Sequence, residues 1–176
     1  KFNKIGLFVS TSYLLLTLIF KWISFQEFKE GLQNQEIDYV EMDTKPSPLN
    51  AILWSSLIET DNGYRTAYYS LFDKKEISYS KEFLKNHHLI KPYLEQKIVQ
   101  QLINISAGWY RIEKENGKLL FWDLRFGQMG MDVDTASFLW YYELNIDKDG
   151  NISAIKRQPQ IKNMSGMFSS LFHRVK

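Results

Sequence analysis

The sequence of 176 residues contains no cysteine and only three histidines, and both scarcities limit its chemistry. Without cysteine the chain has no disulfide bond, no thiolate nucleophile and no zinc site built on sulfur ligands. His87 and His88 are adjacent and point in different directions from a helix or a strand, and His173 is far away in sequence. Because metal ligands must converge, the sequence predicts no metal site within this chain.

A strong excess of charge of either sign is also lacking. Lysine and arginine number 22 and aspartate and glutamate 20, and a net charge of +2 gives no reason to expect nucleic acid as a partner. The composition is 44% hydrophobic and 15% aromatic, which excludes an intrinsically disordered chain. The sequence divides into an expected N-terminal helix over residues 1–34 and one soluble domain over residues 35–176. The second part is long enough for a sizeable core.

The most informative feature present is an apolar segment, residues 5–20, with sixteen positions and no charged side chain. As a helix it would cover roughly 24 Å, slightly less than a bilayer core of about 30 Å. Lys21 can snorkel, and Trp22 is typical of a lipid headgroup interface. After Lys21 the pattern becomes amphipathic. We therefore expect one helix over residues 3–34 that leaves a lipid bilayer and continues into water.

Two other interpretations of this segment stay open. A buried core helix has a similar length, and a signal peptide also places lysines (here Lys1 and Lys4) before an apolar run. The residues from Lys21 to Phe25 do not form a small-residue cleavage site. Because the chain begins with Lys1, we expect it to be a piece of a longer protein in which this helix is the last of several spans. The few flanking lysines do not fix the orientation.

Turn signals divide the rest of the chain into strands. Asx-Gly pairs at 62–63, 116–117 and 149–150 allow the positive φ angles of tight hairpins. The aromatic and β-branched runs beside them are typical of strands: 52–60, 64–72, 109–114, 118–126, 138–146 and 152–158, with 37–43 and 76–79 as shorter candidates. The sequence predicts an α+β fold with about eight strands, in a curved, mostly antiparallel sheet.

Two helices are expected beside this sheet. Pro92 suits the first position of a helix that ends before Gly108, with an apolar stripe that packs on one face of the sheet. The stripe contains Leu94, Ile98, Leu102 and Ile105, widened by Val99 and Ile103. Residues 162–176 have the period of a basic amphipathic helix, which packs on its own protein or lies on an anionic bilayer.

The candidate catalytic residues are Asp123 and Arg125. Strand alternation places both on one face, where they form an ion pair or bind a ligand together. Asn145, Asp147 and Asp149 resemble the first half of a calcium-binding loop, but its twelfth position is Lys156 and not glutamate, so a plain hairpin turn is predicted.

The candidate binding residues are mostly aromatic. Two prolines precede Asn50, which is expected to bond backbone groups at the start of a strand and is a possible ligand contact. Trp54 follows on that strand. Trp54, Tyr69, Trp122 and Trp140 would line an apolar groove if the domain is a binding module.

Four segments resemble a bacterial family, the LexA-regulated, inner-membrane-associated metal-dependent hydrolases. They are Ser12–Thr17 with Lys21, Pro48–Asn50 with Leu53 and Trp54, Gly63–Leu71, and Asp123–Phe126. The resemblance implies a multi-span protein of the bacterial inner membrane, a divalent metal cofactor and a soluble C-terminal part. It implies metal ligands upstream of Lys1, with this domain in an accessory or substrate-selecting role. The alternative is a non-catalytic, membrane-tethered binding or sensor module.

Overall fold

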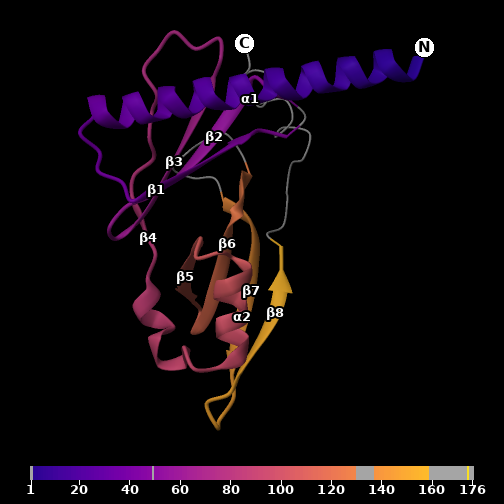
Figure 1. Cartoon of the computed structure of the whole chain (residues 1–176). Coiled ribbons are helices and arrows are strands. Elements are labelled where there is room, and N and C mark those ends of the chain that lie inside the picture. Colours follow the sequence, from indigo (N-terminus) through magenta and orange to yellow (C-terminus); the bar gives the residue numbers. More distant parts are fainter. Residues whose placement is uncertain (1, 49, 130–136, 159–173, 175–176) are drawn as a thin grey trace.

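A computed structural model of the chain describes residues 2–48, 50–129, 137–158 and 174 (Figure 1). A helix of 33 residues, α1 (Phe2–Asn34), is followed by strands, short 3-10 turns and a small helix. These are β1 (Glu41–Pro46), β2 (Leu53–Glu59), β3 (Gly63–Ser70), β4 (Phe83–Leu84), η1 (His87–Leu89), η2 (Lys91–Tyr93), α2 (Lys97–Ile105), β5 (Tyr110–Glu115), β6 (Lys118–Met129), β7 (Ser137–Ile146) and β8 (Ile152–Arg157). The predicted C-terminal amphipathic helix, residues 162–176, lies outside the described residues except for Arg174.

The α+β class is confirmed, and the strands divide into two antiparallel sheets where the sequence predicts one. Sheet A has the order β1-β2-β3-β4 and sheet B the order β5-β6-β7-β8. The predicted strand at 76–79 is not formed, since only Tyr79 makes an isolated bridge, to Ala67. The chain pairs instead at β4, which has only two residues and so ends sheet A.

The three Asx-Gly pairs lie at the predicted hairpins, which join β2 to β3, β5 to β6 and β7 to β8. Between β5 and β6, Asn116 and Gly117 have φ angles of 50° and 80°, the pair of positive values that a type I′ turn requires. Between β7 and β8, the Asp147 carboxylate accepts hydrogen bonds from the backbone N–H groups of Asp149 and Asn151. The segment that resembles a calcium-binding loop is therefore a plain hairpin turn, as predicted.

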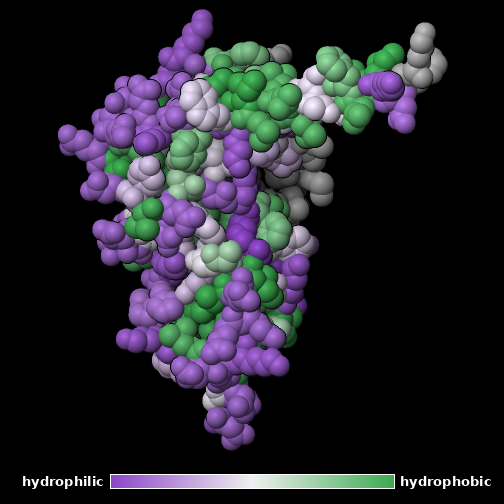
Figure 2. Space-filling view, viewed as in Figure 1, coloured by the Kyte–Doolittle hydropathy of each residue, from purple (hydrophilic) through white to green (hydrophobic). Residues whose placement is uncertain are grey.

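The predicted N-terminal helix is confirmed almost to the residue, and its two halves differ in burial. Ser24, Phe28 and Leu32 are fully buried against sheet A and recur every fourth residue, which places them on one stripe. The half before Phe20 projects beyond the domain with its apolar side chains exposed (Figures 1 and 2). The core-helix interpretation is therefore wrong for this half within the described structure.

The junction between α1 and sheet A is close. Tyr79 donates a hydrogen bond of 2.7 Å from its hydroxyl to the Phe28 carbonyl oxygen. Gly31 lies beneath that hydroxyl, and a Cβ atom at Gly31 would stand 2.5 Å from it. Phe28 also packs edge-on against Tyr69, with ring centroids 6.1 Å apart. These contacts hold the second half of α1 against the sheet.

Helix α2 covers one face of sheet B, but its predicted limits and stripe are partly wrong. It begins at Lys97 and not at Pro92, because residues 91–93 form a 3-10 turn and Gln96 is extended, with φ −76° and ψ 130°. Val99 and Leu102 are buried in the sheet B core. Ile105 is 51% exposed because the helix ends there, before its side chain reaches the sheet.

An apolar cluster joins the two sheets. It combines Leu57 and Tyr64 from sheet A with Leu124 and Phe138 from sheet B, and Trp109 lies among them. The Tyr64 hydroxyl donates to the Gly108 carbonyl oxygen at 3.1 Å, which satisfies the polar end of a buried ring. The two sheets therefore share a core, and α1 is fixed to one end of it.

Candidate functional site

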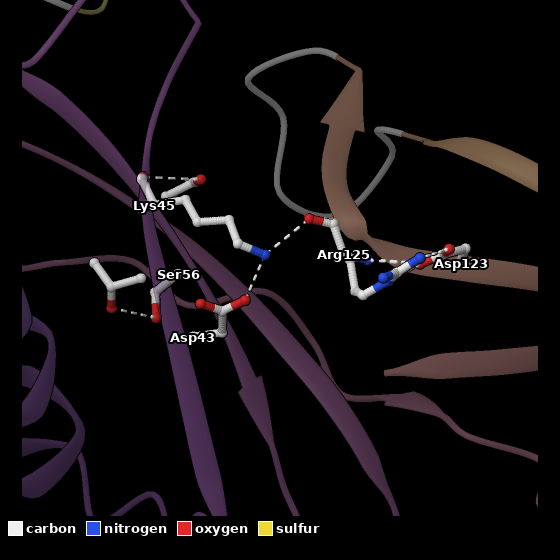
Figure 3. Close-up of polar contacts among 7 residues, drawn as sticks. Asp43, Lys45, Ser56, Asp123 and Arg125 are labelled. Carbon is white, nitrogen blue, oxygen red and sulfur yellow. Dashed lines mark hydrogen bonds and ion pairs between the residues drawn. The ribbon is translucent and has the colours of Figure 1, made fainter. Parts of the chain in front are cut away.

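The predicted pairing of Asp123 and Arg125 is present on β6. The Arg125 guanidinium donates from Nε to Asp123 Oδ1 at 3.0 Å and from Nη2 to Oδ2 at 2.7 Å. The Arg125 backbone N–H donates to Oδ1 as well, at 3.2 Å. The Asp123 side chain is only 3% exposed, whereas that of Arg125 is 30% exposed. The carboxylate is thus enclosed, and the guanidinium lies against it (Figure 3).

A third charged side chain, Lys45 of β1, joins this pair to sheet A. Its ammonium donates a hydrogen bond of 2.8 Å to the Arg125 carbonyl oxygen and forms an ion pair with Asp43 (Figure 3). The carbonyl is available because the pairing of β6 with β7 shifts between Asp123 and Gln128, which is the effect of a bulge. Gly127 supplies the positive φ angle, 75°, within this irregularity. Lys45 therefore connects the bulge of one sheet to the edge strand of the other.

The geometry decides what this cluster can do chemically. Both Asp123 oxygens accept hydrogen bonds from Arg125, so a proton-transfer role for Asp123 would first require the pair to open. The hydrogen bond to Asp123 raises the pKa of Arg125 above its ordinary value, which keeps the guanidinium charged. The cluster therefore links the two sheets through Lys45, and each of its two cations is paired with a carboxylate.

Sequence reasoning missed Lys45. The only signal is that Asp43 and Lys45 are two residues apart in a strand and so share a face. Nothing local to β1 indicates that this face meets the β6 bulge.

Asn50 acts on its own backbone, as predicted. Its Oδ1 atom accepts hydrogen bonds from the N–H groups of Ile52 at 3.0 Å and Leu53 at 2.7 Å. This arrangement satisfies the first donors of β2 after the proline-containing segment. The side-chain oxygen of Asn50 is therefore already engaged.

The structure brings Trp54 and Tyr69 together but places Trp122 elsewhere. Trp54 and Tyr69 are cross-strand partners of β2 and β3, and both are buried beneath α1. Trp122 is half-buried on sheet B, where its ring packs against Tyr141 with centroids 4.6 Å apart. Trp140 lies on β7 with Lys156 over its ring at 4.1 Å. Trp54 and Tyr69 thus lie in one cluster, and Trp122 and Trp140 lie apart from it on sheet B, so the four residues do not line one groove.

A hollow that sequence reasoning missed opens beside the β2–β3 turn. It is lined by Glu59, Thr60, Asp61, Asn62, Glu82, Leu84, Lys85, Asn86, His87 and His88. Lys85 forms an ion pair of 2.7 Å with Glu59 and lies over the rings of Tyr64 and Tyr110. Burial raises the pKa of Tyr110, and the nearby Lys85 opposes this only in part, so the phenol stays protonated. His87 Nδ1 is 2.5 Å from the Tyr110 hydroxyl, which ties the histidine to the same network.

A metal ion requires side-chain ligands that converge on one point. Across residues 2–48, 50–129, 137–158 and 174, no group of three or more histidine, aspartate or glutamate side chains is arranged to hold an ion.

The projecting half of α1 is the remaining functional feature. Within the described residues, α1 is the one helix long and apolar enough to cross a membrane. In its projecting half Leu7 is 69% exposed and Phe8 73% exposed, and this half is visible as the arm at one end of the molecule (Figure 2).

Comparison of the chain with models of known protein families, with curated proteins and with solved structures finds no match.

Proposed function

We propose that this chain is the C-terminal part of a membrane-bound, metal-dependent hydrolase of the bacterial inner membrane, and that its α+β domain is an accessory, substrate-selecting part. The hydrolase class rests on the sequence resemblance, and the observation that carries the membrane attachment is the division of α1. Its first half exposes an apolar surface, its second half packs on sheet A, and the helix as a whole is long and apolar enough to cross a membrane. A domain built in this way is attached rigidly to the lipid bilayer.

The metal chemistry of such an enzyme is assigned to residues upstream of Lys1. The described residues lack a converging ligand set, and Asp123, the most enclosed carboxylate, is occupied by Arg125. A divalent ion bound upstream would supply an activated water for hydrolysis. The role left for this domain is to hold or select the substrate beside that site.

The test compares the longer protein with this chain alone. Both are purified in detergent, analysed for bound metal and assayed with chromogenic esters and phosphoesters. We expect metal and hydrolysis only in the longer protein, with activity lost on chelation. Hydrolysis by this chain alone would overturn the assignment of the metal site upstream.

A non-catalytic binding module tethered to the membrane is the second candidate. The hollow at Lys85 and His87 favours it, because a fixed ammonium and two imidazoles line an opening in the surface. The buried rings of Tyr64 and Tyr110 hold the ammonium in place. Metal-free and inactive longer protein, together with binding of a small ligand that Lys85→Met abolishes, would support this candidate over the first.

A further inference from the structure

The orientation of α1 determines which side of the domain meets the bilayer. Packing on sheet A involves Phe20 and then Ser24, Phe28 and Leu32, so it begins where the uncharged segment ends. A bilayer that receives residues 5–20 therefore has its surface beside the first packing contact. Since the Tyr79–Phe28 hydrogen bond and the close approach at Gly31 fix the helix to sheet A, the domain has little freedom to swing away.

Sheet B extends to the side of α1, and one of its edges lies on the side of the helix N-terminus. Figure 1 shows the strands of sheet B running away from α1 across its axis, and β8 is the strand of this sheet that lies farthest in the direction of the helix N-terminus. The Arg157 end of β8 is the end nearer to α1. On its outer side β8 pairs with no strand of the described residues, since its one partner there is β7.

The chemistry of this edge suits lipid phosphates. Lys156 and Arg157 are exposed at the end of β8, and Lys156 lies over the Trp140 ring. Glu143 pairs with Lys118 at 2.6 Å and with Arg157 at 3.6 Å. Together with Lys156, these side chains carry a net charge of +2. Ile155 adds an exposed apolar side chain. Cations with a tryptophan and an aliphatic residue are typical of a surface that lies at the headgroup level of an anionic membrane.

We infer that the β8 edge of sheet B is a docking surface for the anionic headgroups of the bilayer that α1 crosses. This placement rests on the membrane attachment in the proposed function. The edge stays at headgroup level, because unpaired backbone groups of an edge strand need water or phosphate partners that the hydrocarbon core does not supply. Sheet B then lies along the membrane, with the Asp123–Arg125–Lys45 junction a short way above it.

The absence of cysteine gives a direct test with single labels on the full chain. Leu18→Cys reports the projecting half of α1, Ile155→Cys reports β8, and Gln33→Cys reports the far end of α1. Each variant carries an environment-sensitive fluorophore and is reconstituted in phosphatidylcholine–phosphatidylglycerol vesicles with nitroxide-labelled lipid. We expect labels at Leu18 and Ile155 to be quenched at least about threefold more than the label at Gln33.

Charge reversal separates docking from mere proximity. In the Ile155→Cys background, Lys156→Glu with Arg157→Glu should reduce quenching to the level at Gln33. The matched control, Lys74→Glu with Lys75→Glu, makes the same change of net charge on the β3–β4 connection and should leave quenching unchanged.

The outcomes that overturn the inference are distinct. Quenching at Leu18 with none at Ile155 overturns the docking surface and leaves the proposed function standing. No quenching at Leu18 overturns the membrane attachment and the proposed function with it. Self-quenching between Ile155 labels that grows with protein density would show that a second copy covers β8, which also overturns the inference.

Discussion

The two halves of α1 both carry large apolar side chains, but the pattern of these side chains and their surroundings differ. In the first half, apolar side chains on every face of the helix are exposed, for example Leu7 and Phe8. In the second half, the buried residues fall every fourth position and face sheet A, and charged residues occupy the other faces. The comparison teaches that the distribution of apolar residues around a helix, and not their number alone, predicts where they are buried. An apolar stripe packs on protein, whereas a helix that is apolar on all faces is typical of a protein core or a lipid bilayer.

The largest expected effect tests this difference with one residue type. Phe28→Ala removes a fully buried ring from the junction of α1 and sheet A and should lower the free energy of unfolding by about 3–5 kcal/mol. Phe8→Ala removes an exposed ring and should change it by less than about 0.5 kcal/mol. Thermal and urea unfolding of both variants in the same detergent measures this. Equal losses would contradict the division of the helix.

The next effect concerns the junction between the sheets. Arg125→Met leaves the buried Asp123 carboxylate without its counter-ion and should cost about 3 kcal/mol. Adding Asp123→Asn removes the uncompensated charge, so the double variant should be more stable than the single one. A double-mutant cycle by urea unfolding measures the coupling. Strictly additive losses would mean that the pair contributes nothing as a unit.

A smaller effect is expected from the close approach on α1. Gly31→Ala forces a methyl group against the Tyr79 hydroxyl and should destabilise the domain by about 1–3 kcal/mol. Gly6 has no neighbour within 4 Å, so Gly6→Ala should be neutral or stabilise the helix by up to about 1 kcal/mol. Tyr79→Phe in the Gly31→Ala background should recover part of the loss, as measured by thermal unfolding.

The smallest effect depends on pH. Burial tends to raise the pKa of Asp73, but hydrogen bonds from Arg174 and from the Ser70 N–H outweigh it and hold that pKa below the ordinary value of 3.8. Because the folded pKa is the lower one, the stabilisation is present above the unfolded pKa and is lost as the pH falls through the folded pKa.

Asp73→Asn should therefore cost about 1 kcal/mol at pH 7, and the deficit should shrink as the pH falls below about 4. Urea unfolding from pH 7 to pH 3 measures it. A deficit that does not change with pH would contradict the ion pair with Arg174.

Local signals were sufficient for much of this fold. The length of α1 follows from an uninterrupted helical pattern, and six strands follow from the hairpin pairs and the runs beside them. The turn at Asn116 and Gly117 needs no information beyond two residues. The Asp123–Arg125 pair and the backbone role of Asn50 are also local, since their partners are two or three residues away.

The rest depends on contacts between distant segments. The division into two sheets follows from the short β4 and from the way Tyr64 and Trp109 fill the space between the sheets, which no periodicity reports. The link from Lys45 to Arg125 spans 80 positions and uses a carbonyl that only the β6 bulge makes available. Helix α2 begins after Gln96, whose side chain is bound to a distant segment. It donates to the Gly150 carbonyl in the β7–β8 turn and accepts from the Ile152 N–H of β8.

Because α1 continues without a break from its exposed half onto sheet A, a movement of the exposed half is transmitted to the domain. Its apolar half is shorter than an average bilayer core, so in a membrane the helix stands near the normal with little slack for tilting. The contact between Gly31 and Tyr79 fixes the helix to sheet A, so the helix cannot rotate there unless the sheet rotates with it. A local change in lipid thickness that tilts the helix would therefore rotate the whole α+β domain and carry sheet B toward or away from the membrane surface.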